Sequence, residues 1–390
     1  MKHRVCAVTG SRAEYGLLYP LLLKLSQDNI ELQLVVTGSH LYSAFGDTQR
    51  EIENSGLKIH ERVPIPLEGD SRASIAKATG AALSSFAGYF DENRPELLVL
   101  LGDRYEIFAA AIAASLQGIP IAHLYGGETT VGAVDEFLRH SITKMSILHF
   151  TACEQYRRRV IQLGEAPERV FNVGALGVEN CLHTELMTLP ELQESLGFRL
   201  EDKPYSVVTF HPVTLEDNTA DAQLYELVRA MDAFPGMQYI ITKANADSGG
   251  RTINRIWETE KAIRDNWLVV SSLGKRRYLS ALTYAAMILG NSSSGIIEAP
   301  AMKTPTVNIG DRQRGRVMAD SIICCEPAAK DIISAMEKAL SPAFKAIAAN
   351  AINPFGDGRT SQRIMGVIQK YLAHGPHTMK KIFYDIEGTL

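Results

Sequence analysis

One stretch of small polar residues fits the chemistry of a phosphate site. The segment GNSSSGIIEAP, residues 290–300, follows an apolar run and precedes a resumption of apolar spacing. Ser292 and Ser293 supply hydroxyl donors, while Gly290 and Gly295 are expected to let an anion approach the backbone at the start of a helix. The pattern predicts a phosphate cradle, and a helix capped only by its own serines is the alternative.

Charged residues elsewhere in the chain suit the same ligand. Glu298 is expected on the first turn of the helix after the serines, where its carboxylate can accept hydrogen bonds from a ribose diol. Arg12 in TGSRAEYG follows the first apolar run, and its guanidinium can bind a diphosphate with two donors. GDRQRGR places Arg312, Arg314 and Arg316 after another apolar run. Together these residues predict a diphosphate ligand, although each arginine alone fits a solvated loop equally well.

Other polar residues at the ends of apolar runs suit proton transfer. Asp103 ends PELLVLLGD, Glu128 ends IPIAHLYGGE, and Asp135 opens the helical pattern DEFLRHSITKMS. A single acid in such a place is usually a helix cap or a solvated residue, but several at neighbouring strand ends can act as acid and base in a cleft. His211 in VVTFHPVT is a further candidate, as a proton donor or a diphosphate ligand.

Short apolar runs alternate with helical patterns along the whole chain. Runs such as RVCAVTG, ELQLVVTG and YSVVTFHP lack polar alternation, which predicts parallel strands covered by helices on both faces. The alternation begins again after about residue 180, so the sequence predicts two Rossmann-like α/β units in tandem. Ligands bind beyond the carboxyl ends of the strands in such sheets. Two facing sheets would therefore collect the polar residues above in one cleft.

The expected domains follow from this alternation. An N-terminal Rossmann-like domain over residues 1–178 would carry the catalytic carboxylates, and a second over 179–365 would bind the nucleotide. Residues 366–390 are expected to form a helix and tail that pack back toward the N-terminal domain.

Composition narrows the class of partner. The 390 residues carry a formal net charge of −4, so the chain has no surplus of basic residues to bind a nucleic-acid backbone or an acidic membrane surface. The most apolar long segment, 107–124, contains Gln, Pro and His and is a poor membrane span. Five cysteines without metal-ligand spacing predict free thiols in a reducing cytoplasm and no bound metal. The adjacent Cys324 and Cys325 are expected in the core.

Eight motifs in order carry a family resemblance. They are TGSRAEYG, GDRYE, GGE, DEFLRHSITKMS, FHP, NADSG, GNSSSGIIE and NIGDRQRGR. The chain resembles the UDP-N-acetylglucosamine 2-epimerase family, and above all its hydrolysing bacterial branch, which makes N-acetylmannosamine for sialic acid synthesis; the terminal FYDIEGTL fits that branch too. The resemblance implies an α/β protein of two Rossmann-like domains facing across a cleft (the GT-B fold), a UDP-sugar substrate, no cofactor, and a homodimer or homotetramer.

The resemblance also implies roles for individual residues. Contacts to the nucleotide diphosphate fall to Arg12, Ser292, Ser293, Glu298 and Arg312. The nucleoside would be lined by Asn245 and Leu273, and Arg104 and Arg139 would lie near the diphosphate or the sugar. Catalytic roles fall to Asp103, Asp135 and His211.

One position departs from the family pattern. Several relatives carry a glutamate, taken as catalytic, where HLYGGE has Tyr125. Either Glu128 takes over its task, or Tyr125 donates a proton through its phenol. Which acid acts on which face of the sugar is therefore open.

The predicted reaction converts UDP-N-acetylglucosamine and water to N-acetylmannosamine and UDP through a 2-acetamidoglucal. Alternatives are the same chemistry on a nucleotide-linked 2,4-diacetamido-trideoxy sugar for legionaminic acid, a non-hydrolysing epimerase, a glycosyltransferase, and a nucleotide-sugar sensor without turnover. A nicotinamide dehydrogenase is disfavoured, because no G-x-G-x-x-G follows the first strand.

Overall fold

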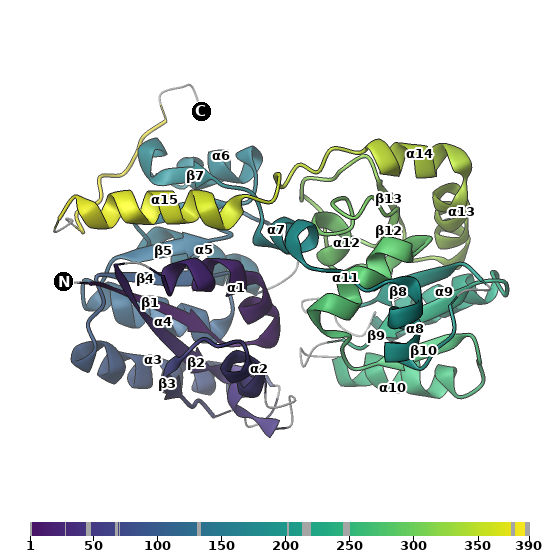
Figure 1. Cartoon of the computed structure of the whole chain (residues 1–390), viewed down its shortest axis with the longest axis horizontal. Coiled ribbons are helices and arrows are strands. Elements are labelled where there is room, and N and C mark those ends of the chain that lie inside the picture. The colour runs from purple at the N-terminus through teal and green to yellow at the C-terminus, as the bar shows by residue number, and fades with distance from the viewer. Residues whose placement is uncertain are drawn as a thin grey trace. The chain divides into compact units, whose positions relative to one another are not determined.

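The computed structural model describes residues 2–27, 29–43, 48–66, 69, 71–130, 134–200, 203–212, 220–244, 250–375 and 379–386. The chain divides into two compact units (Figure 1). Unit 1 comprises Met1–Glu128, Asp135–Asn180 and Phe355–Leu390, and unit 2 comprises Thr129–Val134 and Cys181–Pro354. The main changes of unit fall at 180/181 and 354/355, and the expected domain boundaries are at 178/179 and 365/366.

Unit 1 is built on a seven-stranded parallel sheet in the order β3-β2-β1-β4-β5-β6-β7. Its strands are β1 (His3–Thr9), β2 (Ile30–Thr37), β3 (Ile59–Val63), β4 (Leu97–Leu101), β5 (Ile121–Leu124), β6 (Leu148–Thr151) and β7 (Val170–Asn172). Its helices are α1 (Arg12–Leu25), η1 (Gly38–Leu41), α2 (Gln49–Asn54), α3 (Arg72–Glu92), α4 (Tyr105–Leu116), α5 (Asp135–Met145), α6 (Glu154–Gln162), η3 (Pro167–Arg169) and α15 (Thr360–Ala373).

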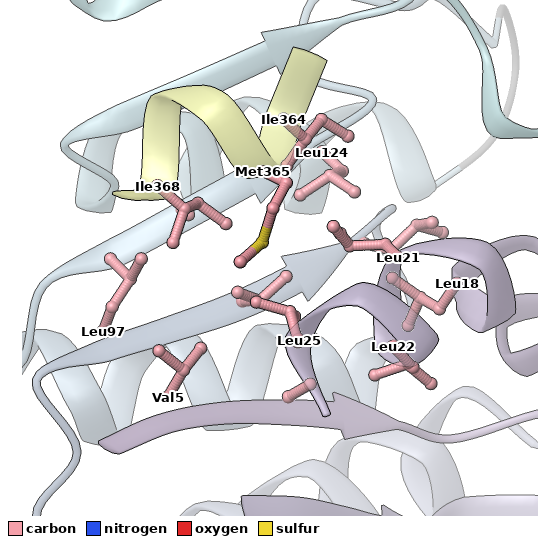
Figure 2. Close-up of a cluster of buried hydrophobic side chains, with 14 of the residues drawn as sticks. Val5, Leu18, Leu21, Leu22, Leu25, Leu97, Leu124, Ile364, Met365 and Ile368 are labelled. Carbon is pink, nitrogen blue, oxygen red and sulfur yellow. The ribbon is translucent and has the colours of Figure 1, made fainter. Parts of the chain in front are cut away.

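Alternate residues of these strands enter two different cores, as the period of a strand requires. On β1, Val5 and Ala7 pack on one face, and Cys6 and Val8 on the other. Helices α1 and α15 cover the first face, where Leu18, Leu21 and Leu22 meet Ile364, Met365 and Ile368 (Figure 2). Helices α3 and α4 cover the second face. The C-terminal helix α15 is thus part of the core of unit 1.

Unit 2 repeats the plan with a six-stranded parallel sheet in the order β10-β9-β8-β11-β12-β13. Its strands are β8 (Tyr205–Thr209), β9 (Gln238–Thr242), β10 (Trp267–Val270), β11 (Met287–Gly290), β12 (Thr306–Ile309) and β13 (Ile322–Cys325). Its helices are α8 (Leu189–Leu196), α9 (Ala220–Asp232), α10 (Gly250–Lys261), α11 (Gly274–Tyr284), α12 (Ser294–Ile297), α13 (Ala329–Leu340) and α14 (Pro342–Asn350), and α7 (Leu176–His183) spans the change between the units.

In each sheet the strand order changes direction between two adjacent strands. These are β1 and β4 in unit 1, and β8 and β11 in unit 2. Such a switch point leaves a crevice beyond the carboxyl ends of the two strands, where doubly wound sheets bind ligands. The segments at these ends begin at Gly10, Gly102, Phe210 and Asn291. Among the helices of the described ranges, none is both long and apolar enough to span a bilayer.

Candidate active site

Asp103 is held by an ion pair just beyond the carboxyl end of β4. Nε of Arg139 donates to Oδ2 of Asp103 at 2.7 Å, and a second guanidinium nitrogen of Arg139 donates to the same oxygen. The Arg139 side chain is 3% exposed and that of Asp103 is 22% exposed. Two donors on one oxygen fix the orientation of the carboxylate while leaving part of it accessible.

Arg139 joins three acidic residues of unit 1. Its Nη1 donates to the backbone oxygen of Glu128 at 2.8 Å and to Oε2 of Glu136 at 3.0 Å. Burial alone would lower the pKa of Arg139, but the charges of Asp103, Glu128 and Glu136 outweigh burial and raise it. A place for Arg139 near the diphosphate or the sugar stays a prediction; in this structure its guanidinium contacts the carboxylates of Asp103 and Glu136.

The other predicted acid–base residues of unit 1 follow β5 in the sequence. Glu128 is buried, and Asp135 is the half-buried first residue of α5. Tyr125 follows β5 with φ of +68°, an uncommon conformation for a residue other than glycine. Its hydroxyl accepts a hydrogen bond from the N–H of Gly177 in α7 at 3.4 Å, and its ring packs against the core that α1 and α15 cover.

Arg12 and Arg104 lie at the switch point of unit 1. Nη2 of Arg12 contacts Oε1 of Glu51 on α2 at 2.6 Å, and the two side chains are 40% and 45% exposed. Nε of Arg104 donates to Oε1 of the buried Glu106 at 2.7 Å. An exposed ion pair contributes little to stability, so Arg12 can exchange Glu51 for a phosphate at small cost.

His211 and Asn291 connect the two strand ends at the switch point of unit 2. The N–H of His211 donates to Oδ1 of Asn291 at 2.7 Å, and Nδ2 of Asn291 donates back to the oxygen of His211 at 2.8 Å. The backbone oxygen of Asn291 accepts from Nη1 of Arg312 at 3.1 Å and from Nε2 of Gln313 at 2.8 Å. Asn291 therefore fixes His211 and Arg312 relative to each other.

The environment of His211 keeps its imidazole neutral. Burial, and to a smaller extent the positive charge of Arg312, lowers the pKa of His211 to about 3. Nδ1 of His211 is buried and has no hydrogen-bond partner in the part of the chain that the structure describes. A neutral imidazole has one N–H group that can donate a hydrogen bond to an incoming anion. To act as a proton-donating imidazolium, the ring would first have to gain a second proton.

The serine segment differs from its prediction in one respect. Helix α12 spans only Ser294–Ile297, and Glu298 is the residue that ends it rather than a member of its first turn. A single helical turn has almost no macrodipole, so an anion here would depend on hydroxyl and backbone N–H donors. Oγ of Ser294 donates to Oε2 of Glu298 and accepts from the hydroxyl of Tyr278 at 2.6 Å. Burial raises the pKa of Glu298.

The glycines of the segment have a packing role, besides the predicted one of letting an anion approach the backbone. Gly290 has φ of +134°, and a Cβ there would lie 2.0 Å from the oxygen of Thr209. A Cβ on Gly295 would lie 2.9 Å from Cγ2 of Thr306. Both glycines are required by the close packing of β11 and α12 on neighbouring strands, whether or not an anion binds.

The three arginines of GDRQRGR do not act as one cluster. Arg312 is half-buried and contacts Asn291, whereas Arg314 is exposed. Nε of Arg316 donates to the oxygen of Thr129 at 3.1 Å, which ties the 129–130 segment to unit 2. Of the three, Arg312 alone lies at the switch point.

Two predicted nucleoside contacts remain predictions. Asn245 lies outside the described residues. Leu273 precedes α11, and its buried side chain belongs to the core that includes Leu279 and Leu282.

Glu136, Asn291 and Gln313 were not among the predicted site residues. Glu136 contacts Arg139 and Asn291 contacts His211, while Gln313 contacts Asn291. Asn291 stands directly after β11, and its polar character at a strand end was the available signal. Within the described ranges, no group of three or more His, Cys, Asp or Glu side chains is arranged to hold a metal ion.

Comparison with known proteins bears on this arrangement. The sequence profile described as UDP-N-acetylglucosamine 2-epimerase matches residues 23–369. The chain belongs to the UDP-N-acetylglucosamine 2-epimerase family. It is 39% identical to the polysialic acid biosynthesis protein P7 of Escherichia coli, over 98% of this chain and 97% of that protein. It is 40% identical to the GDP/UDP-N,N'-diacetylbacillosamine 2-epimerase (hydrolyzing) of Campylobacter jejuni, over 88% of this chain and 89% of the relative.

Solved structures of this epimerase family share the fold. The Neisseria meningitidis UDP-GlcNAc 2-epimerase bound to UDP-GlcNAc superposes with a TM-score of 0.80 at 18% identity, covering 94% of this chain and 100% of that one. The predicted GT-B fold class, with two parallel-sheet α/β domains, is confirmed.

Proposed function

We propose that this epimerase-family member is a hydrolysing UDP-N-acetylglucosamine 2-epimerase, which converts UDP-N-acetylglucosamine and water to N-acetylmannosamine and UDP for sialic acid biosynthesis. The observation that carries the proposal is the similarity, near 40% identity along most of the chain, to a polysialic acid biosynthesis protein and to an epimerase named as hydrolysing. The arrangement of polar groups at the two switch points supports it.

The reaction makes three demands on the protein. A base must take the proton from C2 while the C1–O bond breaks and UDP leaves with the bonding electrons, giving a 2-acetamidoglucal. Water then adds at C1 and loses a proton, while an acid delivers a proton to C2 from the other face. The site must also stabilise the charge that develops on the departing diphosphate.

Unit 1 supplies the proton-transfer groups in this proposal. Asp103 and Asp135 act at C2 and at the attacking water, with Glu128 in support. The two guanidinium donors from Arg139 support the role of Asp103, because a group that transfers protons must be held in one orientation. Each proton transfer by a positioned group contributes roughly 10²- to 10⁴-fold in rate.

Unit 2 holds the nucleotide in this proposal. Arg312, Ser292 and Ser293 bind the diphosphate, together with Arg12 and Arg104 from the strand ends of unit 1. Asn245 and Leu273 line the nucleoside, and Glu298 binds the ribose. The low pKa of His211 favours a neutral imidazole that donates one hydrogen bond to the leaving group over an imidazolium that gives up a proton.

A second substrate is favoured by a specific observation. The relatives from Campylobacter jejuni and Legionella pneumophila are both named as hydrolysing N,N'-diacetylbacillosamine 2-epimerases. The alternative is therefore the same elimination and hydration on a nucleotide-linked 2,4-diacetamido-trideoxy sugar.

One experiment separates these possibilities. The protein is incubated in D₂O with UDP-N-acetylglucosamine or with UDP-N,N'-diacetylbacillosamine, and products are followed by proton NMR. Free N-acetylmannosamine carrying deuterium at C2 is the expected result. Turnover of the diacetamido sugar alone would identify that sugar nucleotide as the substrate. An epimerised UDP-sugar as product would indicate a non-hydrolysing epimerase. The absence of turnover and of C2 exchange with either sugar would reject the function.

We also propose a homodimer or homotetramer in the cytoplasm, which light scattering and cell fractionation can test. All five cysteines are free thiols, which is compatible with a reducing compartment.

A further inference from the structure

Two buried carboxyl groups near the candidate active site have no role in the proposed reaction. Glu14 lies in the first turn of α1 and Glu106 in the first turn of α4, the helices that follow β1 and β4. Glu14 is 6% exposed and Glu106 is 0% exposed. The two strands flank the switch point of unit 1. Glu14 lies two residues after Arg12, and Glu106 lies two residues after Arg104.

Both carboxyl groups contact Gly10, the first residue after β1. The N–H of Gly10 donates to Oε2 of Glu14 at 2.8 Å, and the hydroxyl of Ser11 donates to the same oxygen at 3.3 Å. A Cβ on Gly10 would lie 2.4 Å from Oε1 of Glu106, and one on Gly38 would lie 2.9 Å from it. The glycines leave the room that the Glu106 carboxyl occupies.

The hydrogen bonds of this pair are incomplete. Oε1 of Glu106 accepts from Nε of Arg104, but Oε2 of Glu106 and Oε1 of Glu14 are buried and have no partner among the described residues. Two ionised carboxylates served by one arginine leave a buried charge uncompensated, which is costly. A proton on one carboxyl removes that charge and supplies a donor.

The surrounding charges indicate which carboxyl holds the proton. Burial, and then the negative charge of Glu106, raises the pKa of Glu14 to about 8, against the opposing effects of Arg104 and the Gly10 N–H; Asp103 adds to the increase. His40 on η1 contributes no positive charge near neutral pH, since burial lowers its pKa to about 4. Tyr105 is a further titratable neighbour of Glu106, and burial raises the pKa of Tyr105 to about 12.

We propose that Glu14 is a neutral acid at physiological pH and that, paired with the Glu106 carboxylate, it positions Arg104 and the Gly10–Ser11 turn. Neither carboxyl touches the substrate in this proposal. Ionisation of Glu14 adds a second carboxylate that competes with Glu106 for Arg104, so the arrangement loosens in alkali. The catalytic consequence rests on the proposed function, whereas the neutral state of Glu14 does not.

The first test needs no substrate. A carboxyl group whose pKa is higher in the folded state than in the unfolded chain stabilises the fold below the unfolded value, here 4.5, and loses that contribution as the pH rises toward about 8. Glu14→Gln cannot ionise. Melting temperatures between pH 5 and 9 should therefore show the variant gaining on the wild type up to pH 8, with a constant difference above it.

A matched control and a second variant keep this test decisive. Glu92→Gln, at an exposed position on α3, should follow the wild type at every pH. Glu106→Gln removes the neighbouring charge and should move the Glu14 inflection to lower pH. A difference between Glu14→Gln and wild type that does not change with pH would overturn the proposal, and so would an inflection unmoved in Glu106→Gln.

The second test uses kcat against pH with whichever sugar nucleotide the protein turns over. Glu14→Gln should keep kcat at pH 7 and extend activity to higher pH. Glu106→Gln should lower kcat about tenfold, because it replaces the charged acceptor of Arg104 with a neutral one. The reverse pattern would overturn the positioning role. If neither sugar nucleotide is turned over, the proposed function fails, while the melting experiment still decides whether Glu14 is neutral.

Discussion

Asp103 and His211 are each held by one side chain from a distant part of the sequence. Arg139 lies 36 residues from Asp103, and Asn291 lies 80 residues from His211. Arg139 reaches a carboxylate, whereas Asn291 reaches backbone atoms and leaves the imidazole unengaged. The first contact orients the Asp103 carboxylate, whereas the second fixes the backbone of His211 and leaves its ring available, which is consistent with proton transfer at Asp103 and hydrogen bonding at His211.

Replacing Asp103 by Asn should abolish turnover without changing nucleotide affinity. Asparagine has the same size and can accept a hydrogen bond from Arg139, but it cannot take a proton. We expect kcat to fall roughly 10²- to 10⁴-fold. Product NMR measures kcat, and titration calorimetry with UDP measures the dissociation constant.

The control for this variant is Asp91→Asn, at an exposed position on α3. It should leave both quantities unchanged. A loss of UDP affinity in Asp103→Asn with kcat intact would place Asp103 in nucleotide binding and not in proton transfer.

Arg312 and Arg314 provide a matched pair for the diphosphate site. Arg312 is half-buried beside Asn291, whereas Arg314 is exposed two residues away. Arg312→Ala should weaken UDP binding roughly 10- to 100-fold, the effect of losing hydrogen bonds between charged groups. Calorimetry should show no change for Arg314→Ala, and equal losses in both variants would indicate a diffuse electrostatic effect.

At the scale of elements, continuous apolar runs made the central strands predictable and the edge strands less so. PELLVLLGD marked β4 because all five of its strand residues are buried. By contrast, β3 reads IHERV with three exposed residues, and β7 has only three residues, so neither has a recognisable pattern. The expectation that Cys324 lies in the core was wrong, since Cys324 is exposed on the edge strand β13 and Cys325 is half-buried.

The same contrast applies to the candidate site. Asp103 and His211 could be chosen as candidates because each is a polar residue two positions beyond the end of a buried strand. The contacts of Arg139 and Glu106 depend on how helices pack beside those strands, and those of Asn291 depend on the pairing of β11 with β8. A local pattern contains neither. Glu298 at the end of a one-turn helix is a further example, because Pro300 and the turn after it end the helix early.

Helix α5, which begins at Asp135 and carries Arg139, is anchored at its other end by the C-terminal tail. Nζ of Lys381 donates to the backbone oxygens of Lys144 at 2.9 Å and Ser146 at 2.6 Å, where α5 ends. It also contacts Oε2 of the buried Glu165 at 2.6 Å. A cation at the carboxyl end of a helix is favourable because it meets unpaired carbonyl groups and the negative end of the dipole.

Lys381→Met should therefore destabilise unit 1. The change removes a charged donor from three acceptors and should cost roughly 1.5–3 kcal/mol, seen as a lower melting temperature by circular dichroism. Lys345→Met, at an exposed position on α14, should change the free energy of unfolding by less than about 0.5 kcal/mol. Equal effects of the two variants would mean that the tail does not anchor α5.

At the scale of the whole molecule, the two units have separate cores and separate optical probes. Unit 1 buries side chains on both faces of its sheet, including residues of α15 that come from the far end of the sequence. Both tryptophans of the chain, Trp257 and Trp267, are buried in unit 2 with ring centroids 5.7 Å apart. Tryptophan fluorescence therefore reports on unit 2, while far-ultraviolet circular dichroism reports on both units.

Ile368→Ala should destabilise unit 1 without affecting unit 2. Ile368 is fully buried between α15 and the sheet (Figure 2), and removing its side chain should cost about 2–5 kcal/mol. In denaturant, part of the dichroism change, the part that comes from unit 1, should move to a lower denaturant concentration. The midpoint of the tryptophan fluorescence change should stay constant. Ile382→Ala, in the same unit but 89% exposed, should move neither midpoint. A joint shift of both signals in Ile368→Ala would show that the units unfold as one, because destabilising one core would then lower the stability reported by the other.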